Sequence, residues 1–72
     1  MGHNNPLRGH RDRTGQSLQA VGSALKVSRA TVWGWEKRRR MPTARDVAAL
    51  ADHFGLNDSR TVEMLRWFAN VG

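Results

Sequence analysis

The chain contains no cysteine, which removes several classes of small protein. Without thiols there is no disulfide framework, no cysteine nucleophile and no zinc finger with cysteine ligands. The sequence also lacks an apolar run near the roughly 20 residues of a membrane span, and its start, MGHNNPLRG, has no signal-peptide stretch. We therefore expect a cytoplasmic protein with no membrane partner.

Acidic residues are scarce, because six Asp and Glu stand against twelve Lys and Arg, for a formal net charge of +6. The surplus is concentrated in residues 26–45, where seven basic residues accompany one acidic residue, whereas residues 46–72 are net acidic. A concentrated basic segment is typical of a surface that binds a polyanion, although it can also be a solvated face. Nucleic acid is therefore the leading partner class.

Catalytic constellations are missing as well. The three histidines, His3, His10 and His53, have no partner at the helical spacing of metal ligands. The sequence has no Ser-His-Asp order and no Gly-rich phosphate loop. We expect no enzyme activity, no metal and no cofactor.

What the sequence does contain is a regular series of helix caps and stops. These signals divide residues 1–72 into five short helices of one all-α domain. The predicted caps are Asn5, Ser17, Ser28 and Thr43, and the predicted stops are Gly15 and Gly55. We expect the helices over about residues 6–14, 18–25, 29–38, 44–54 and 58–70, with a basic loop over 37–42.

The second and third predicted helices have the spacing of a helix-turn-helix over about residues 17–38, in which the second helix enters the major groove of DNA. Close crossing of the two helices needs a small residue, which Gly22 supplies. The shared core needs apolar residues, and these are Val21, Leu25, Val27, Val32 and Trp35. The pattern therefore predicts a DNA-binding motif.

Three strings carry a family resemblance: TGQSLQAVGSALKVSRATVWGWE, KRRRMPT and VAALADHFGL. On these strings, residues 7–56 resemble the Cro/CI-type (lambda-repressor-like) helix-turn-helix family. The resemblance implies a five-helix fold that binds double-stranded DNA and regulates transcription. It also implies a partly buried ion pair between Arg11 and Glu36, although Arg11 could instead be a phosphate ligand.

The outward face of the third predicted helix is expected to read DNA if Val32 and Trp35 point inward. The residues expected to read bases are Arg29, Ala30, Thr31, Trp33 and Gly34. The residues expected to contact phosphates are Ser17, Ser28, Lys37, Arg38, Arg39 and Arg40. Arg29 is the leading candidate for base reading, because its planar guanidinium can donate hydrogen bonds to guanine O6 and N7 at the same time. Alternatively, the Trp33 side chain folds back onto the loop or the second predicted helix and does not contact DNA.

The sequence departs from the family pattern at three positions. Leu18 stands where a bracing Gln is usual, and Lys26 stands at a turn position usually held by Gly. His10 replaces an apolar residue, which predicts loose packing of the first helix.

The last predicted helix carries two apolar stripes, and a surface helix needs only one. The first stripe is Val62, Leu65, Phe68 and Ala69, and the second is Met64, Trp67 and Val71. A symmetric dimer through this helix would cover the surplus apolar surface, and we expect Met64, Trp67, Phe68 and Val71 at its interface. The alternative is that one core needs both stripes.

These observations predict a Cro-like repressor that binds a palindromic operator as a homodimer. Restriction-modification controllers and antitoxins share the fold and size, and an antitoxin would add a toxin partner. A different alternative is a basic domain that binds nucleic acid without reading sequence.

Overall fold

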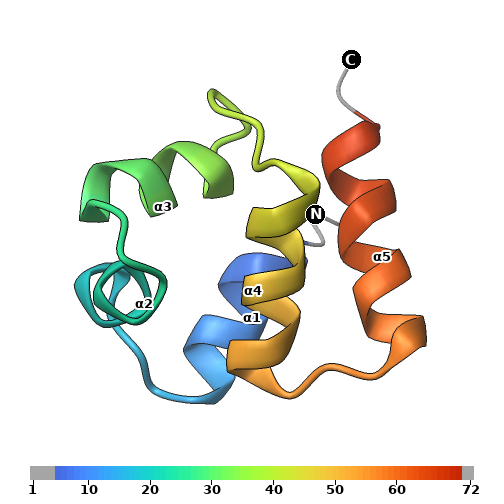
Figure 1. Cartoon of the computed structure of the whole chain (residues 1–72), viewed down its shortest axis with the longest axis horizontal. Helices are drawn as coiled ribbons and strands as arrows, with labels where there is room; N and C mark the ends of the chain where they lie inside the picture. Colours follow the sequence, from blue (N-terminus) through green and yellow to red (C-terminus); the bar gives the residue numbers. More distant parts are fainter. Residues whose placement is uncertain (1–4, 71–72) are drawn as a thin grey trace.

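Five helices account for the regular structure of residues 5–70, which are the residues that the computed structural model describes, and no strand occurs among them (Figure 1). The helices are α1 (Pro6–Arg13), α2 (Leu18–Leu25), α3 (Arg29–Glu36), α4 (Ala44–Phe54) and α5 (Asp58–Ala69). The predicted all-α, five-helix fold is confirmed. The helix α3 ends two residues before the predicted Arg38, because Arg38 adopts a left-handed backbone with φ of 56° that no α-helix continues. His3 and Val71 lie outside the described residues.

Side-chain caps begin every helix. In each case the capping oxygen accepts a hydrogen bond from the backbone N–H three residues later, and the caps are Asn5, Ser17, Ser28, Thr43 and Asn57. At α4 the Asp46 carboxylate also accepts from the Thr43 N–H at 2.9 Å, which completes a capping box. The helices are thus delimited by short-range polar contacts that the sequence already displays.

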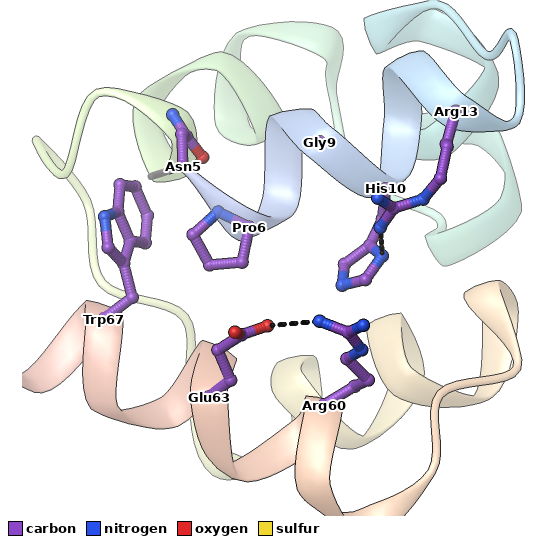
Figure 2. A pocket seen from close by; sticks show the side chains of 8 residues that line it. All are labelled: Asn5, Pro6, Gly9, His10, Arg13, Arg60, Glu63 and Trp67. Carbon is purple, nitrogen blue, oxygen red and sulfur yellow. Dashed lines mark hydrogen bonds and ion pairs between the residues drawn. The ribbon is translucent and has the colours of Figure 1, made fainter. Parts of the chain in front are cut away.

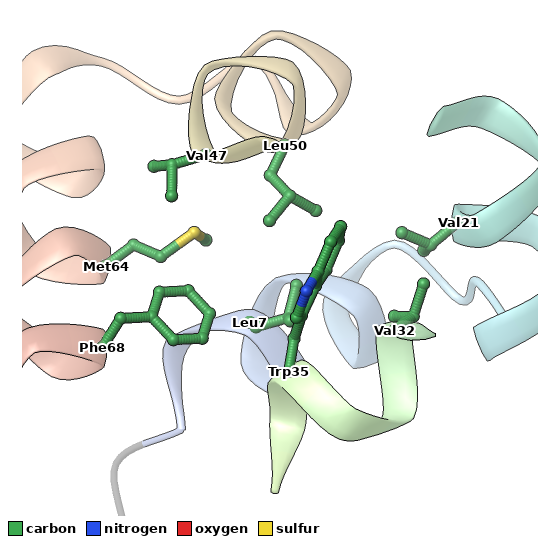
Figure 3. Packing of buried hydrophobic residues seen from close by; sticks show 8 residues of the cluster. All are labelled: Leu7, Val21, Val32, Trp35, Val47, Leu50, Met64 and Phe68. Atoms are coloured by element: carbon green, nitrogen blue, oxygen red, sulfur yellow. The ribbon is translucent and has the colours of Figure 1, made fainter. Parts of the chain in front are cut away.

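The core is a single cluster to which all five helices contribute (Figure 3). Its buried members are Leu7, Val21, Val32, Trp35, Val47, Leu50, Met64 and Phe68. The Trp35 indole, only 2% exposed, occupies the centre, with Val21 and Val32 on one side and the α5 side chains on the other. Figure 1 shows α2 and α3 on one side of the molecule and α5 on the opposite side, and α4 contacts both α2 and α5.

The inward face of α5 differs from the prediction. Met64 is fully buried and Phe68 is 6% exposed, so both belong to the core and were wrongly assigned to a dimer interface. The reason is that α5 packs against α1 and α4 along the row that contains these two residues. Val62 and Leu65, each 43% exposed, face outward instead. Trp67 is half-buried and stacks edge-on against Phe68 at 5.0 Å.

The crossing of α2 and α3 depends on Gly22 and on the turn that follows. A Cβ atom at Gly22 would lie 2.7 Å from the carbonyl oxygen of Val27, which is closer than any real contact. The turn itself passes through Lys26, whose φ of 62° places it in the left-handed region, as its position predicts. This conformation costs a non-glycine residue on the order of 1 kcal/mol. The chain tolerates this strain because the crossing brings two helices into one core.

His10 is buried, although it stands where an apolar residue is usual. Its ring lies 5.8 Å from that of Phe54, and the Arg13 guanidinium donates to its Nδ1 at 2.7 Å. Burial lowers the pKa of His10 below its ordinary value, and the positive charge of Arg13 adds to this effect. The imidazole is therefore neutral at pH 7.

The contact at Gly22 makes a matched pair of glycine substitutions informative. We expect Gly22→Ala to destabilise the fold by roughly 1 to 3 kcal/mol, because the backbone of Val27 must move. Gly9→Ala should instead stabilise it by about 0.5 to 1 kcal/mol, because Gly9 is helical and no atom lies within 4 Å of the added Cβ. Urea unfolding followed by circular dichroism measures both. Equal effects of the two substitutions would contradict the crossing constraint.

Candidate nucleic-acid interface

The outward face of α3 carries a row of exposed side chains. Arg29, Ala30 and Trp33 are exposed, and Thr31 is half-buried. The opposite face of the helix is buried through Val32, Trp35 and Glu36. The burial of one face therefore presents a cation, a methyl group and an indole together on the other face.

Gly34 does not belong to this exposed face, although the sequence predicts that it reads bases. It is buried, and a Cβ added there would lie 3.1 Å from the Cγ and Cδ atoms of Arg40. Its carbonyl oxygen accepts hydrogen bonds from the N–H groups of Arg39, at 2.9 Å, and Arg40, at 3.2 Å. Gly34 is thus where the basic loop folds back onto α3, with the Arg40 side chain packed closely over it.

Arg38 also differs from its predicted role as a phosphate ligand. Its Nη1 donates to the carbonyl oxygens of Trp67, at 3.2 Å, and Asn70, at 3.0 Å. Its guanidinium lies 4.3 Å from the centre of the Trp67 ring, within cation–π range. The cation therefore sits at the carboxyl end of α5, where the helix dipole favours positive charge. Arg38 therefore connects the loop after α3 to the carboxyl end of α5.

The other loop cations remain on the outside. Lys37, Arg39 and Arg40 are exposed. The Arg39 guanidinium lies 5.4 Å and the Lys37 Nζ 6.0 Å from the centre of the Trp33 ring. These contacts hold the indole at the edge of α3, so Trp33 is neither a core residue nor free in solvent.

Leu18 forms the other wall of a notch beside Trp33. The notch has a volume of about 300 Å³ and is lined by Leu18, Arg29, Ala30 and Trp33. Leu18 occupies the position where a polar brace is usual, and it contributes an apolar surface instead. No sequence pattern predicts this contact of Leu18 with α3, because the notch forms only when the two helices cross.

The amino-terminal ends of α2 and α3 are electrostatically uncompensated. Neither helix has an acidic residue in its first turn, whereas α4 has Asp46 and α5 has Asp58. The Ser17 and Ser28 hydroxyls, both on exposed residues, each cap one backbone N–H. The partial positive charge of these two helix ends is thus free to attract an anion such as a phosphate.

An ion pair holds the end of α3 against α1. Arg11 Nε lies 2.7 Å from Glu36 Oε2, and its Nη2 donates to Glu36 Oε1 at 3.2 Å, so the contact is bidentate. The Glu36 side chain is 6% exposed and that of Arg11 is 16% exposed. The hydrogen bonds that Arg11 donates to the Glu36 carboxylate raise the pKa of Arg11. With Nη1 donating to the Gln16 carbonyl oxygen at 3.2 Å, Arg11 is committed inside the protein and does not face the solvent as a phosphate ligand would.

The part of the chain that the structure describes shows no cluster of three or more residues able to hold a metal ion. Within residues 5–70, every helix is too short or too polar to cross a membrane.

Comparison with families of known proteins places the chain in one of them. A family described as a helix-turn-helix domain matches residues 6–64, which include all of α1–α4 and about half of α5. This family falls within the Cro/CI-type helix-turn-helix clan. Searches of the curated proteins and of the solved structures found no match.

The Arg11–Glu36 pair is testable by removing one partner or both. Arg11→Met leaves a buried carboxylate unpaired and should cost about 3 to 5 kcal/mol of unfolding free energy. The double variant Arg11→Met, Glu36→Leu removes both charges and should recover most of this loss. Arg8→Met is the control, because its pair with Asp12 is more than half exposed and should matter by less than about 0.5 kcal/mol. If urea unfolding gives the same value for Arg11→Met and Arg8→Met, the pair does not anchor α3.

Proposed function

Since the chain belongs to the helix-turn-helix domain family, we propose that it is a transcriptional regulator that reads double-stranded DNA with the outward face of α3. We further propose that it acts as a Cro-like repressor on a two-fold symmetric operator. The observation that carries the proposal is the exposed row of Arg29, Ala30 and Trp33 on a helix whose other face is buried.

Base reading begins at the amino-terminal end of α3. The guanidinium of Arg29 can bond guanine O6 and N7 as a pair, and Ala30 and Thr31 can meet a thymine methyl group. Trp33 then contributes an apolar wall, and the notch between its ring and Leu18 suits a methyl group or a sugar edge. Each of these contacts requires an exposed side chain on one face, which the burial pattern of α3 provides for Arg29, Ala30 and Trp33.

Phosphate contacts flank this face. The free amino-terminal ends of α2 and α3, with Ser17 and Ser28, can each receive one phosphate oxygen. Lys37, Arg39 and Arg40 supply charge from the loop after α3, and such contacts position a protein without reading sequence. Arg38 has no part in this set, because it is bonded to the end of α5.

Dimerisation is proposed through the outward face of α5. Val62 and Leu65 are exposed there, and an apolar groove of about 340 Å³ runs from Leu65 to the exposed Met41. The recognition helices of a dimer on successive major grooves are about 34 Å apart, so each lies about 17 Å from the two-fold axis. A molecule with extents of 27 × 25 × 25 Å and with α3 and α5 on opposite sides fits this requirement (Figure 1). A dimer bound in this way would block a promoter by occupying it.

The first test is selection of bound sites from a random DNA pool, followed by two variants. Arg29→Ala should lose about 1 to 3 kcal/mol of discrimination at one base position. Arg39→Ala should weaken binding to all sequences alike. It should also reduce the slope of log affinity against log salt concentration by about 1, which corresponds to one counterion fewer released on binding. Arg8→Ala, on α1, is the control, since its exposed side chain belongs to neither the proposed DNA contacts nor the proposed dimer face, and it should change neither. If no motif is enriched, or if Arg29→Ala behaves like Arg39→Ala, the domain binds nucleic acid without direct readout.

The dimer is tested by placing a charge on the outward face of α5. Leu65→Lys should leave the circular dichroism spectrum unchanged, since Leu65 is 43% exposed, but should shift sedimentation from dimer to monomer. It should also reduce binding to a full palindrome toward that of a half-site. Ala49→Lys, an exposed position on α4 outside both proposed surfaces, serves as the charge control. A monomeric wild type, both free and on operator DNA, would refute the dimer.

A further inference from the structure

A cavity of about 180 Å³ lies between α1 and α5, apart from the residues assigned to DNA (Figure 2). From α1 it is lined by His10 and Arg13, and from α5 by Arg60 and Glu63. Figure 2 shows the His10 ring and the Arg60 guanidinium facing each other across the space between the two helices. None of these four residues takes part in the proposed contacts with DNA or in the proposed dimer.

The hydrogen bond from Arg13 determines which nitrogen of His10 carries the proton. A guanidinium can only donate, so Nδ1 of His10 accepts the 2.7 Å hydrogen bond from Arg13. In the neutral ring the proton is therefore on Nε2, which becomes a donor. Nε2 is fully buried and has no hydrogen-bond partner. A buried N–H without an acceptor is rare and unfavourable, which points to an acceptor that the chain does not itself provide.

The charges around the cavity define the chemistry of that acceptor. Two guanidiniums, from Arg13 and Arg60, line it with a single carboxylate, from Glu63. This carboxylate is 3.4 Å from Arg60 Nη1, so it is already paired on the α5 side. Three donor groups thus surround one space that has a net positive charge. The Arg60 side chain is more than half exposed, which leaves a route from solvent.

We propose that this cavity binds a small oxyanion, either a carboxylate or a phosphate, between α1 and α5. One anion oxygen accepts from Nε2 of His10, and another accepts from the guanidinium of Arg60. The volume is below the range of pockets that hold drug-sized ligands, so a nucleotide or a larger effector is excluded. Because the anion bridges two helices of the folded state, it stabilises the packing of α5 against α1.

The test follows the ring signals of His10 by NMR while sodium phosphate or sodium acetate is added at constant ionic strength, above pH 7. We expect a saturable shift of the Nε2 resonance with at least one of the two anions. The anion that saturates identifies the class, as phosphate or as carboxylate. A second readout is the pKa of His10, which a bound negative charge raises by offsetting the nearby Arg13 and Arg60.

Variants separate the cavity from the basic DNA face, which also attracts phosphate. Arg60→Gln should weaken the anion affinity by about tenfold or more, since one charge-assisted hydrogen bond is lost. Arg66→Gln, also on α5 but outside the cavity, and Arg39→Ala, on the DNA face, should leave the affinity unchanged. His10→Phe keeps a buried aromatic ring and should abolish the anion-dependent rise in melting temperature that remains in Arg39→Ala.

Two results would overturn the proposal. The first is the absence of a saturable shift with either anion, which would mean that only water fills the cavity. The second is an equal loss of affinity in Arg60→Gln and Arg66→Gln, which would mean that anions respond to the general positive charge of the protein.

Discussion

The burial of Trp35 is the constraint on which the rest of the structure depends. Its indole lies at the centre of the core, where side chains from the other four helices surround it (Figure 3). An aromatic ring of this size contributes more buried apolar area than any other single core residue, so α3 cannot rotate without opening the core. The rotation of α3 in turn decides which side chains face outward. The proposed DNA surface is therefore a consequence of core packing as much as of charge.

Two arginines have structural roles that differ from those of two arginines on the proposed DNA face. Arg11 and Arg38 are held inside the structure, the first by a buried carboxylate and the second by carbonyl oxygens and an indole. Arg29 and Arg39 remain exposed beside Trp33. In the sequence, Arg38 and Arg39 are adjacent members of one basic run. Their separation arises because the left-handed backbone at Arg38 turns its side chain toward α5 while its neighbour stays over α3.

Short-range signals predicted most of the fold. The caps at Ser17, Ser28 and Thr43, and the stop at Gly55, depend on hydrogen bonds and backbone angles within a few residues, so they can be recognised from the sequence. The small residue at Gly22 could be recognised too, since two helices joined by a tight turn must cross closely. The predictions that the structure contradicts concern residues whose contacts are long-range. Met64, Phe68, Gly34 and Arg38 were each assigned to a surface, and each is instead engaged in packing or in contacts between helices.

The sequence by itself determined the helices, the helix-turn-helix spacing and the inward direction of Val32 and Trp35, because these follow from contacts between residues close in the chain. Only the tertiary structure decided which apolar residues of α5 are buried, since Met64 comes from one predicted stripe and Phe68 from the other, and the choice depends on the shapes of α1 and α4. It alone also brought His10 on α1 opposite Arg60 on α5, a juxtaposition of residues 50 positions apart that no local pattern encodes. Packing between helices far apart in the sequence determines which residues contact one another. Those contacts decide whether a side chain is buried in the core, connects two elements or binds a ligand.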